Sequence, residues 1–268
     1  MTDKRDILVV DDEPVIAQGV SKVCSAEGMS VDVAESGAAG LKMLSEGRYT
    51  IVICDIMMPQ MDGFQFLAEV ARRKLRTLVV MATGYSTVEN AVRSLSCGAV
   101  DFIPKPFTAD ELLSVLRRDL KFSRLQEPVV PSTPGGIPGF PSHIPPPPEY
   151  HRLGYAGWAL VEAAGTVLLG VSDLFLKTIG EIRKIDLLPP GGETAQGNGC
   201  AAITAADGLV HSLMCPVSGR IIEANLKAAS GPAIVEKDPY FAGWLYRVLP
   251  SDLERDLRRL GARGPGPV

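Results

Sequence analysis

The chain has 268 residues, of which 46% are hydrophobic and 22% are charged, with a formal net charge of −4 and a pI near 5.5. This length corresponds to one large or two ordinary domains. The acidic balance argues against a nucleic-acid-binding protein, which usually carries a basic patch. No apolar run approaches the roughly 20 residues of a membrane span, and the N-terminal apolar stretch is too short for a signal peptide. We therefore expect a soluble, cytoplasmic protein.

The residues that most often hold metals or form disulfides are few and scattered. There are five cysteines and three histidines. The cysteine count is odd, no cysteine pair has the C-x-x-C spacing, and no histidines stand at metal-ligand spacing. We expect neither a disulfide framework nor a zinc site.

Short apolar runs alternate with helix-like segments over the first 126 residues. The runs predict strands at 7–10, 31–34, 51–54, 78–81 and 100–103. Helix starts or ends are indicated at Pro14, Gly28, Ser36, Ser86 with Glu89, and Thr108 with Glu111. Five strand–helix pairs favour an α/β fold, with a parallel sheet between two layers of helices. We expect a flavodoxin-like (βα)5 domain with strand order 2-1-3-4-5.

Polar side chains follow four of these strands. Asp11 and Asp12 come after the first strand, Asp55 after the third, Thr83 after the fourth and Lys105 after the fifth. Ligands of such sheets bind at the carboxyl ends of the strands, so these side chains should share one cleft. Three carboxylates in one cleft repel one another unless a cation neutralises them. Oxygen ligands alone favour Mg²⁺.

The motifs around these residues resemble the receiver domain of two-component response regulators. The matching segments are VVDDEP (9–14), VICDIMMPQMDG (52–63), MATGY (81–85) and DFIPKPF (101–107). Their order, spacing and strand positions agree with the family over about 120 residues, a far more specific signal than a lone pair of aspartates. The resemblance implies a phosphoacceptor domain.

The resemblance also implies roles for the acidic residues. Asp55 would attack a phosphohistidine of a sensor histidine kinase. Asp12, Asp55 and the backbone carbonyl of Met57 would hold Mg²⁺, and Asp11 would act through a bound water. The bulky side chains of Met57 and Tyr85 would hinder the water that hydrolyses the acyl phosphate, so we expect a phosphoryl lifetime of minutes or longer.

The remaining receiver positions concern the response to phosphorylation. By resemblance, Thr83 and Lys105 would contact phosphoryl oxygens, and the peptide before Pro106 would be cis. Phe102 stands at the position of the family's switch aromatic residue; the alternative is that it is simply core. The family commonly dimerises through its fourth helix, fifth strand and fifth helix, so a phosphorylation-favoured homodimer is expected there.

A proline-rich segment divides the chain. Nine of the 24 residues from 127 to 150 are proline, which excludes helix and favours an extended spacer. At roughly 3.1 Å per residue, such a spacer could reach about 75 Å. It would join a receiver domain of residues 1–126 to a second domain of residues 151–268.

The second domain is predicted to be mostly β. Apolar runs predict strands at 158–161, 166–169, 201–204, 209–213 and 219–223, and helices at 172–180 and 252–260. Asp207–Gly208 between two of these strands is a hairpin signal. Tyr240, Trp244 and Tyr246 are interpreted as core of a C-terminal strand, with interface anchors as the alternative.

Three segments of this domain resemble the H protein of the glycine cleavage system, a lipoyl carrier with a barrel-sandwich fold. They are GVSDLFLKTIGEI (170–182), LMCPVSGRIIEAN (213–225) and KDPYFAGWLYRVLPSDL (237–253). The family's lipoyl lysine stands eleven residues before the glycine that corresponds to Gly219, and that position is Gly208. Residues 198–212 contain no lysine. Because lipoylation requires an amine, we expect no cofactor on this domain.

These observations favour a response regulator, not an enzyme, whose output is phosphorylation-gated contact between its non-lipoylated second domain and an unknown protein partner. Nucleic acid and membrane are not expected as partners. The alternatives are a phospho-controlled, carrier-like protein of glycine cleavage or lipoyl metabolism, and a phosphate sink that drains a kinase. Lipoylation, detected as a fixed mass increment, would favour the carrier.

Overall fold

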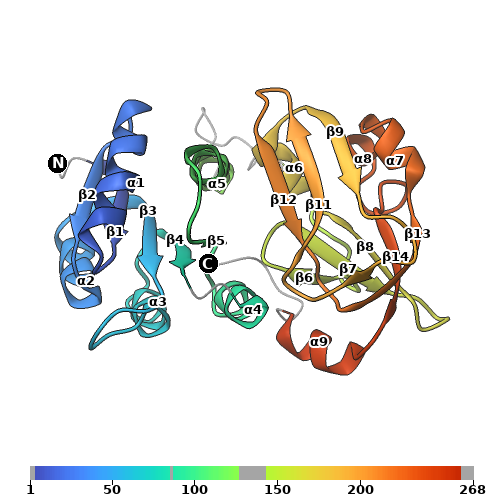
Figure 1. The fold of residues 1–268 in the computed structure, drawn as a ribbon, viewed down its shortest axis with the longest axis horizontal. Coiled ribbons are helices and arrows are strands. Elements are labelled where there is room, and N and C mark those ends of the chain that lie inside the picture. Colours follow the sequence, from blue (N-terminus) through green and yellow to red (C-terminus); the bar gives the residue numbers. More distant parts are fainter. Residues whose placement is uncertain (1–3, 85–86, 127–142, 261–268) are drawn as a thin grey trace, which may run out of the picture.

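The computed structural model describes residues 4–84, 87–126 and 143–260. Figure 1 shows two parts side by side, a helix-covered parallel sheet and a mostly β part. Residues 127–142 of the predicted linker lie outside the described residues. Its last residues contact the second part, because the Ile144 amide donates to Asp173 Oδ2 at 2.7 Å and the Tyr150 side chain is buried.

The first part contains the predicted five-stranded sheet. Its strands are β1 (Lys4–Val10), β2 (Val31–Ala34), β3 (Arg48–Asp55), β4 (Leu78–Thr83) and β5 (Asp101–Pro104). The strands are parallel, in the order β2-β1-β3-β4-β5. The prediction of an α/β domain with order 2-1-3-4-5 is confirmed. Three strands, β1, β3 and β4, are longer than predicted, since backbone pairing continues past the apolar runs, and β5 begins one residue later than predicted.

Five helices connect these strands: α1 (Pro14–Ala26), α2 (Gly37–Glu46), α3 (Gly63–Arg72), α4 (Val88–Ser96) and α5 (Ala109–Leu125). Ser36 caps α2, and Thr108 with Glu111 forms the predicted capping box of α5. Thr87 caps α4 by accepting a hydrogen bond from the Asn90 amide. Ser86, the cap that the S-x-x-E spacing indicates, lies outside the described residues.

Alternation along the strands divides the receiver core into two layers. Ile7, Val9, Ile51 and Ile53 face α1 and α5, whereas Leu8, Val10, Val52 and Cys54 face α2 and α3. All eight side chains are at most 3% exposed. Helices cover both faces, so the central residues of β1, β3 and β4 are apolar on both sides of the sheet, as is typical of buried parallel sheets. In these three strands the charged residues stand at the ends.

The second part contains two antiparallel sheets. The strands are β6 (His151–Leu153), β7 (Gly157–Val161), β8 (Val167–Val171), β9 (Ile182–Leu187), β10 (Glu193–Thr194), β11 (Gly199–Ala205), β12 (Val210–Met214), β13 (Gly219–Ala224) and β14 (Tyr246–Pro250). One sheet has the order β10-β13-β14-β8-β7-β6 and the other β12-β11-β9. The short helices are α6 (Asp173–Ile179), α7 (Leu226–Ser230), α8 (Ala233–Lys237) and α9 (Leu253–Arg259).

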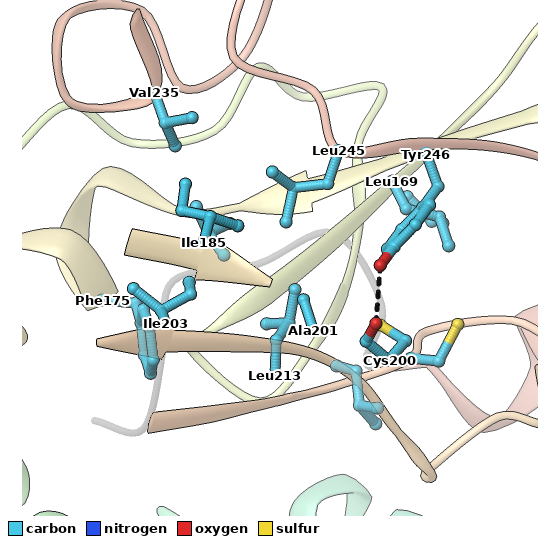
Figure 2. Packing of buried hydrophobic residues seen from close by; sticks show 14 of the residues in the cluster. Leu169, Phe175, Ile185, Cys200, Ala201, Ile203, Leu213, Val235, Leu245 and Tyr246 are labelled. Carbon is cyan, nitrogen blue, oxygen red and sulfur yellow. Dashed lines mark hydrogen bonds between the residues drawn. The ribbon is translucent and has the colours of Figure 1, made fainter. Parts of the chain in front are cut away.

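The two sheets enclose a hydrophobic core, part of which Figure 2 shows. Tyr246 lies in this core, and its hydroxyl donates to the Cys200 carbonyl oxygen at 2.6 Å. Tyr240 is also buried, and Trp244 is half-buried. The interpretation as core is confirmed for Tyr240 and Tyr246, but only Tyr246 lies in the C-terminal strand β14; Tyr240 and Trp244 precede it. The predicted strands and both predicted helices are present, and the C-terminal strand is β14, but β6, β9, β10, α7 and α8 were not predicted.

None of the helices in the described ranges is long and apolar enough to cross a membrane.

Candidate functional site

The carboxyl ends of the receiver strands bring the predicted site residues together. Asp11 follows β1, Asp55 ends β3, Thr83 ends β4 and Lys105 follows β5. These four side chains are all buried, with exposures of 3%, 4%, 0% and 8% in that order. Asp12 lies on the same edge but is exposed. The sheet topology therefore places four polar groups from four strands in one buried cluster.

Lys105 is the centre of this cluster. Its Nζ lies 2.8 Å from Asp11 Oδ2 and 2.7 Å from Asp55 Oδ1, and Glu13 Oε1 is 3.6 Å away. The Lys105–Pro106 peptide is cis, as the resemblance implies. One ammonium group thus bridges two buried carboxylates that the sequence separates by 44 residues.

The electrostatics of the cluster follow from burial and pairing. Burial raises the pKa of Asp11, and the Lys105 hydrogen bond offsets only part of this effect. Burial alone would lower the pKa of Lys105, but its hydrogen bonds to Asp11 and Asp55 outweigh burial, so the pKa is raised. Lys105 therefore stays charged over the whole physiological range and can supply positive charge to an anion at Asp55.

The carboxylate oxygens of Asp11, Asp12 and Asp55 are ligands that a hard cation such as Mg²⁺ prefers. In this structure one oxygen of Asp11 and one of Asp55 contact Lys105 instead. Asp55 Oδ2 accepts the Met57 amide at 2.7 Å, and Asp11 Oδ1 accepts the Glu13 amide at 3.0 Å. Within the described ranges, no three His, Cys, Asp or Glu side chains are close enough together to hold a metal ion. The Asp12 carboxylate, which is exposed on the same edge, is the further oxygen ligand that such a site would use.

Two predictions concern side chains that would slow hydrolysis of the phosphoryl group. The Met57 side chain is 57% exposed beside Asp55, in a position to hinder approach from solvent. Tyr85 lies outside the described residues.

The backbone beside Asp55 leaves no room for a side chain at position 63, a position to which the sequence analysis gave no role. A Cβ on Gly63 would lie 2.4 Å from the Asp55 carbonyl oxygen and 2.9 Å from the Ile56 Cα. The Gly63 amide also donates to the Ile56 carbonyl at 2.9 Å. The start of α3 thus packs directly against the backbone of the phosphoacceptor.

We expect Gly63→Ala to destabilise the receiver by about 1–3 kcal/mol, the usual effect of overpacking. Gly19→Ala is the matched control: Gly19 lies inside α1 with no atom near its missing Cβ, so the change should stabilise by about 0.5–1 kcal/mol. Urea unfolding of the two variants measures both effects. Equal free energies of unfolding of the two variants would show that position 63 has room for a methyl group beside the Asp55 carbonyl.

The receiver face formed by α4, β5 and α5 packs against the second domain. Val92 of α4 is 2% exposed and belongs to the same buried cluster as Leu153 of β6, and Leu95 packs on that cluster. Phe122 of α5 packs against Tyr155, with ring centroids 4.5 Å apart and the rings tilted by 43°. The face that the resemblance assigns to a homodimer is therefore covered by the chain's own second domain.

Arg118 of α5 is the polar centre of this contact. It forms an ion pair with Asp101 of β5, and its Nε and Nη1 donate to Tyr155 Oη at 2.9 Å and to His211 Nδ1 at 3.2 Å. The Tyr155 hydroxyl donates in turn to Asp119 Oδ1 at 2.9 Å. Burial raises the pKa of Asp119 well above its usual range. Sequence reasoning missed this network, since its members come from separate segments and no motif connects them.

Phe102, the predicted switch residue, is buried at 6% exposure in the receiver core. Met214 of the second domain packs on the same cluster. Phe102 thus lies where the receiver core meets the second domain.

Gly208, at the position of the family's lipoyl lysine, lies at the tip of the hairpin between β11 and β12. Its φ is +88°, and a Cβ there would meet no atom within 4 Å. The tip is therefore open enough for a side chain, but it offers no amine to modify.

Comparison with protein families identifies the domain type of both parts of the chain. The model of the response regulator receiver domain matches residues 7–117, and the model of the glycine cleavage H-protein matches residues 149–263. The chain contains a response regulator receiver domain and a glycine cleavage H-protein domain. The H-protein domain is mostly β, as predicted.

Curated relatives match through the receiver domain. The chain is 35% identical to the regulatory protein AtoC of Escherichia coli over 129 residues and 39% identical to the transcriptional regulatory protein DltR of Streptococcus agalactiae over 119 residues. These matches cover 48% and 44% of this chain, but only 28% and 53% of the respective relatives. The chain thus spans roughly a quarter to a half of the length of these relatives.

Solved structures resemble each domain separately. The NtrX receiver domain from Brucella abortus is 37% identical, covers 43% of this chain and 98% of its own, and has a TM-score of 0.42. A glycine cleavage system H protein from Mycobacterium marinum is 28% identical, covers 39% of this chain and 86% of its own, and has a TM-score of 0.37.

Proposed function

We propose that the chain is a two-component response regulator that accepts a phosphoryl group on Asp55 from a sensor histidine kinase. The observation that carries the proposal is Lys105, which bridges the buried carboxylates of Asp11 and Asp55. A buried lysine between two carboxylates can leave one of them for a phosphoryl oxygen with little change in position. The receiver family match supports the same activity.

The chemistry assigned to Asp55 is nucleophilic attack by a carboxylate oxygen on the phosphorus of a phosphohistidine. A new O–P bond forms, the N–P bond breaks, and the kinase histidine takes the electron pair. Phosphoryl transfer depends mainly on in-line positioning and charge neutralisation. Lys105 would neutralise one phosphoryl oxygen, and the Thr83 hydroxyl, also at the carboxyl edge, would donate to another.

Mg²⁺ is the cofactor that this donor set fits. Asp12 and Asp55, together with the Met57 carbonyl, would hold the ion, and Asp11 would act through a water. The bound ion would neutralise charge on the phosphoryl group. Before phosphorylation, Lys105 satisfies the two buried carboxylates, so the folded receiver does not need the ion for stability.

The proposed output is protein contact made by the H-protein domain. Gly208 has no side chain to carry lipoate, so the carrier activity of the family does not transfer to this chain. The retained scaffold offers a surface that a protein partner can recognise. The receiver packs directly on this scaffold through α4, β5 and α5, which supplies a physical connection between Asp55 and the output.

Capture from an extract of the native host tests the proposal. We expect the full-length chain with Mg²⁺ and beryllofluoride, a phosphoryl mimic, to retain a protein that the untreated chain and the Asp55→Ala variant do not retain. Removal of residues 143–268 should abolish the capture. An identical set of captured proteins in every state would contradict phosphorylation-gated output and favour the phosphate sink.

A further inference from the structure

Two cysteines of the H-protein domain, Cys200 of β11 and Cys215 directly after β12, lie in the same hydrophobic core. Their side chains are 2% and 0% exposed, and Figure 2 shows Cys200 among the core side chains. The strand register shifts between Gly199 and Ala201, so Cys200 is the extra residue of a β-bulge. The two thiols are close enough to form a hydrogen bond with each other. The fold thus pairs two cysteines whose spacing of 15 positions gave no signal in the sequence.

The surroundings of Cys215 favour its thiolate more than those of Cys200 do. The Cys200 thiol donates a hydrogen bond to the Cys215 sulfur. The Thr194 hydroxyl, buried with no other hydrogen-bond partner among the described residues, donates a second one. These donors outweigh burial, so the pKa of Cys215 is lowered, whereas the same hydrogen bond and burial raise the pKa of Cys200 well above its usual range. Cys215 is therefore the more nucleophilic sulfur, and Cys200 remains a thiol.

The other three cysteines of the chain lie apart from one another. Cys24 and Cys54 are buried in different layers of the receiver core. Burial raises the pKa of Cys24 to about 11 and the pKa of Cys54 well above its usual range. Cys97 is exposed at the end of α4. The chain thus contains one pair of sulfurs, two separate buried thiols and one exposed thiol.

A cavity of about 380 Å³ reaches the backbone beside the sulfur pair. Asn198 and Gly199, which precede Cys200, line this cavity, as does Met214, which precedes Cys215. Residues of β5 and α5 of the receiver line its other side. A molecule the size of hydrogen peroxide can therefore come within one residue of each sulfur, although neither sulfur is open to bulk solvent. Larger oxidants, such as a peptide disulfide, are excluded by the same burial.

We propose that Cys200 and Cys215 are a modification site, at which hydrogen peroxide forms a reversible disulfide. The Cys215 thiolate attacks one peroxide oxygen, the O–O bond breaks, and the sulfur becomes a sulfenic acid while the other oxygen leaves as water. The Cys200 sulfur then attacks the Cys215 sulfur, the S–O bond breaks, and a second water leaves with the Cys200 proton. Two thiols and one peroxide thus give one disulfide and two waters, and a dithiol reductant reverses the change.

The disulfide would close a loop that contains Gly208, at the hairpin tip, and His211. Arg118 of the receiver donates to His211 Nδ1 at 3.2 Å, so the cross-linked segment includes a contact between the two domains. A cross-link between neighbouring strands restricts the separation of those strands. Oxidation therefore acts on the base of the β11–β12 hairpin. The inference is independent of Asp55, so its failure would leave the proposed phosphoacceptor function unaffected.

Peptide mapping of the full-length chain tests the inference. The chain carries Cys97→Ser, which removes the exposed thiol that could join two chains, and is treated with hydrogen peroxide before unfolding and labelling with N-ethylmaleimide. Residues 185–220 contain both cysteines and no lysine or arginine before Arg220, so trypsin releases the pair in one peptide. We expect this peptide to carry two labels before treatment. After treatment it should carry no label and have lost two hydrogen atoms, and dithiothreitol should restore both labels.

Cys24 and Cys54 are the controls within the same chain. They are as deeply buried as the pair but have no neighbouring thiol, so their peptides should keep their labels after the peroxide treatment. Two labels remaining on the 185–220 peptide would overturn the inference. Loss of label from Cys24 and Cys54 at the same rate as from the pair would also overturn it, because the reaction would then not depend on a second thiol.

Two variants separate the attacking sulfur from the resolving sulfur. In the Cys200→Ser chain, a sulfenic acid on Cys215 has no thiol to react with, so dimedone, which traps sulfenic acids, should add to Cys215. In the Cys215→Ser chain, Cys200 should form roughly tenfold less adduct, because its pKa is raised. Equal adducts in the two chains, or more adduct on Cys200, would overturn the assignment of Cys215 as the sulfur that attacks the peroxide.

Discussion

Asp55→Asn is expected to reduce phosphoryl incorporation from acetyl phosphate to the level of a blank without protein. Asparagine has nearly the shape of aspartate but no carboxylate nucleophile, and no other carboxylate at the site is free to replace it. Asp11 remains paired with Lys105 at 2.8 Å, and Asp12 is exposed at the end of another strand. Phosphate-affinity electrophoresis of the full-length chain measures the effect. Omission of Mg²⁺ should have the same result.

The control for this variant is Asp186→Asn, which changes an exposed aspartate of β9 in the other domain and should leave incorporation unchanged. The Asp55→Asn chain should also remain folded, because Lys105 keeps one buried carboxylate partner. A cooperative thermal unfolding transition of the Asp55→Asn chain would show that it is folded. Substantial incorporation into folded Asp55→Asn would mean that another residue accepts the phosphoryl group, and the assignment of Asp55 would be wrong.

Arg118→Ala is expected to lower the free energy of unfolding by about 3–5 kcal/mol, the usual effect of removing one partner of a buried ion pair. Arg118 is 5% exposed, and its loss leaves the Asp101 carboxylate buried without its cation. It also removes the donors to Tyr155 and His211. For a chain of this size, the first thermal transition should fall by roughly 10 °C.

Arg72→Ala is the matched control for this prediction. Arg72 pairs with Glu69 by two hydrogen bonds on the surface of α3, but its side chain is 68% exposed. Exposed ion pairs contribute little to stability, so the unfolding midpoint should not change measurably. Similar effects of Arg72→Ala and Arg118→Ala would mean that the interdomain network is solvated in solution, and the close contact of the two domains would then be contradicted.

The receiver fold and its site could be predicted from the sequence because their determinants are local. Apolar runs of four residues, such as 51–54 and 78–81, fall within strands β3 and β4, and Thr108 with Glu111 marks the start of α5 as predicted. The motif residues follow strands directly, so any parallel sheet brings Asp11, Asp55, Thr83 and Lys105 to one edge. In the second domain, residue patterns predicted the hairpin, and the resemblance to the H protein identified Gly208 as the position that lacks an amine.

The sequence by itself therefore determined the two domain types, the strand order of the receiver and the residues of the acidic cluster. Tertiary structure alone decided how the domains meet. Arg118, Tyr155 and His211 stand far apart in the chain, and none belongs to a recognisable motif. Their importance arises from burial, which removes water and makes each unpaired charge or donor costly. Neither their burial nor the coverage of the α4–β5–α5 face is encoded in local periodicity, because both depend on a contact between segments about 90 residues apart.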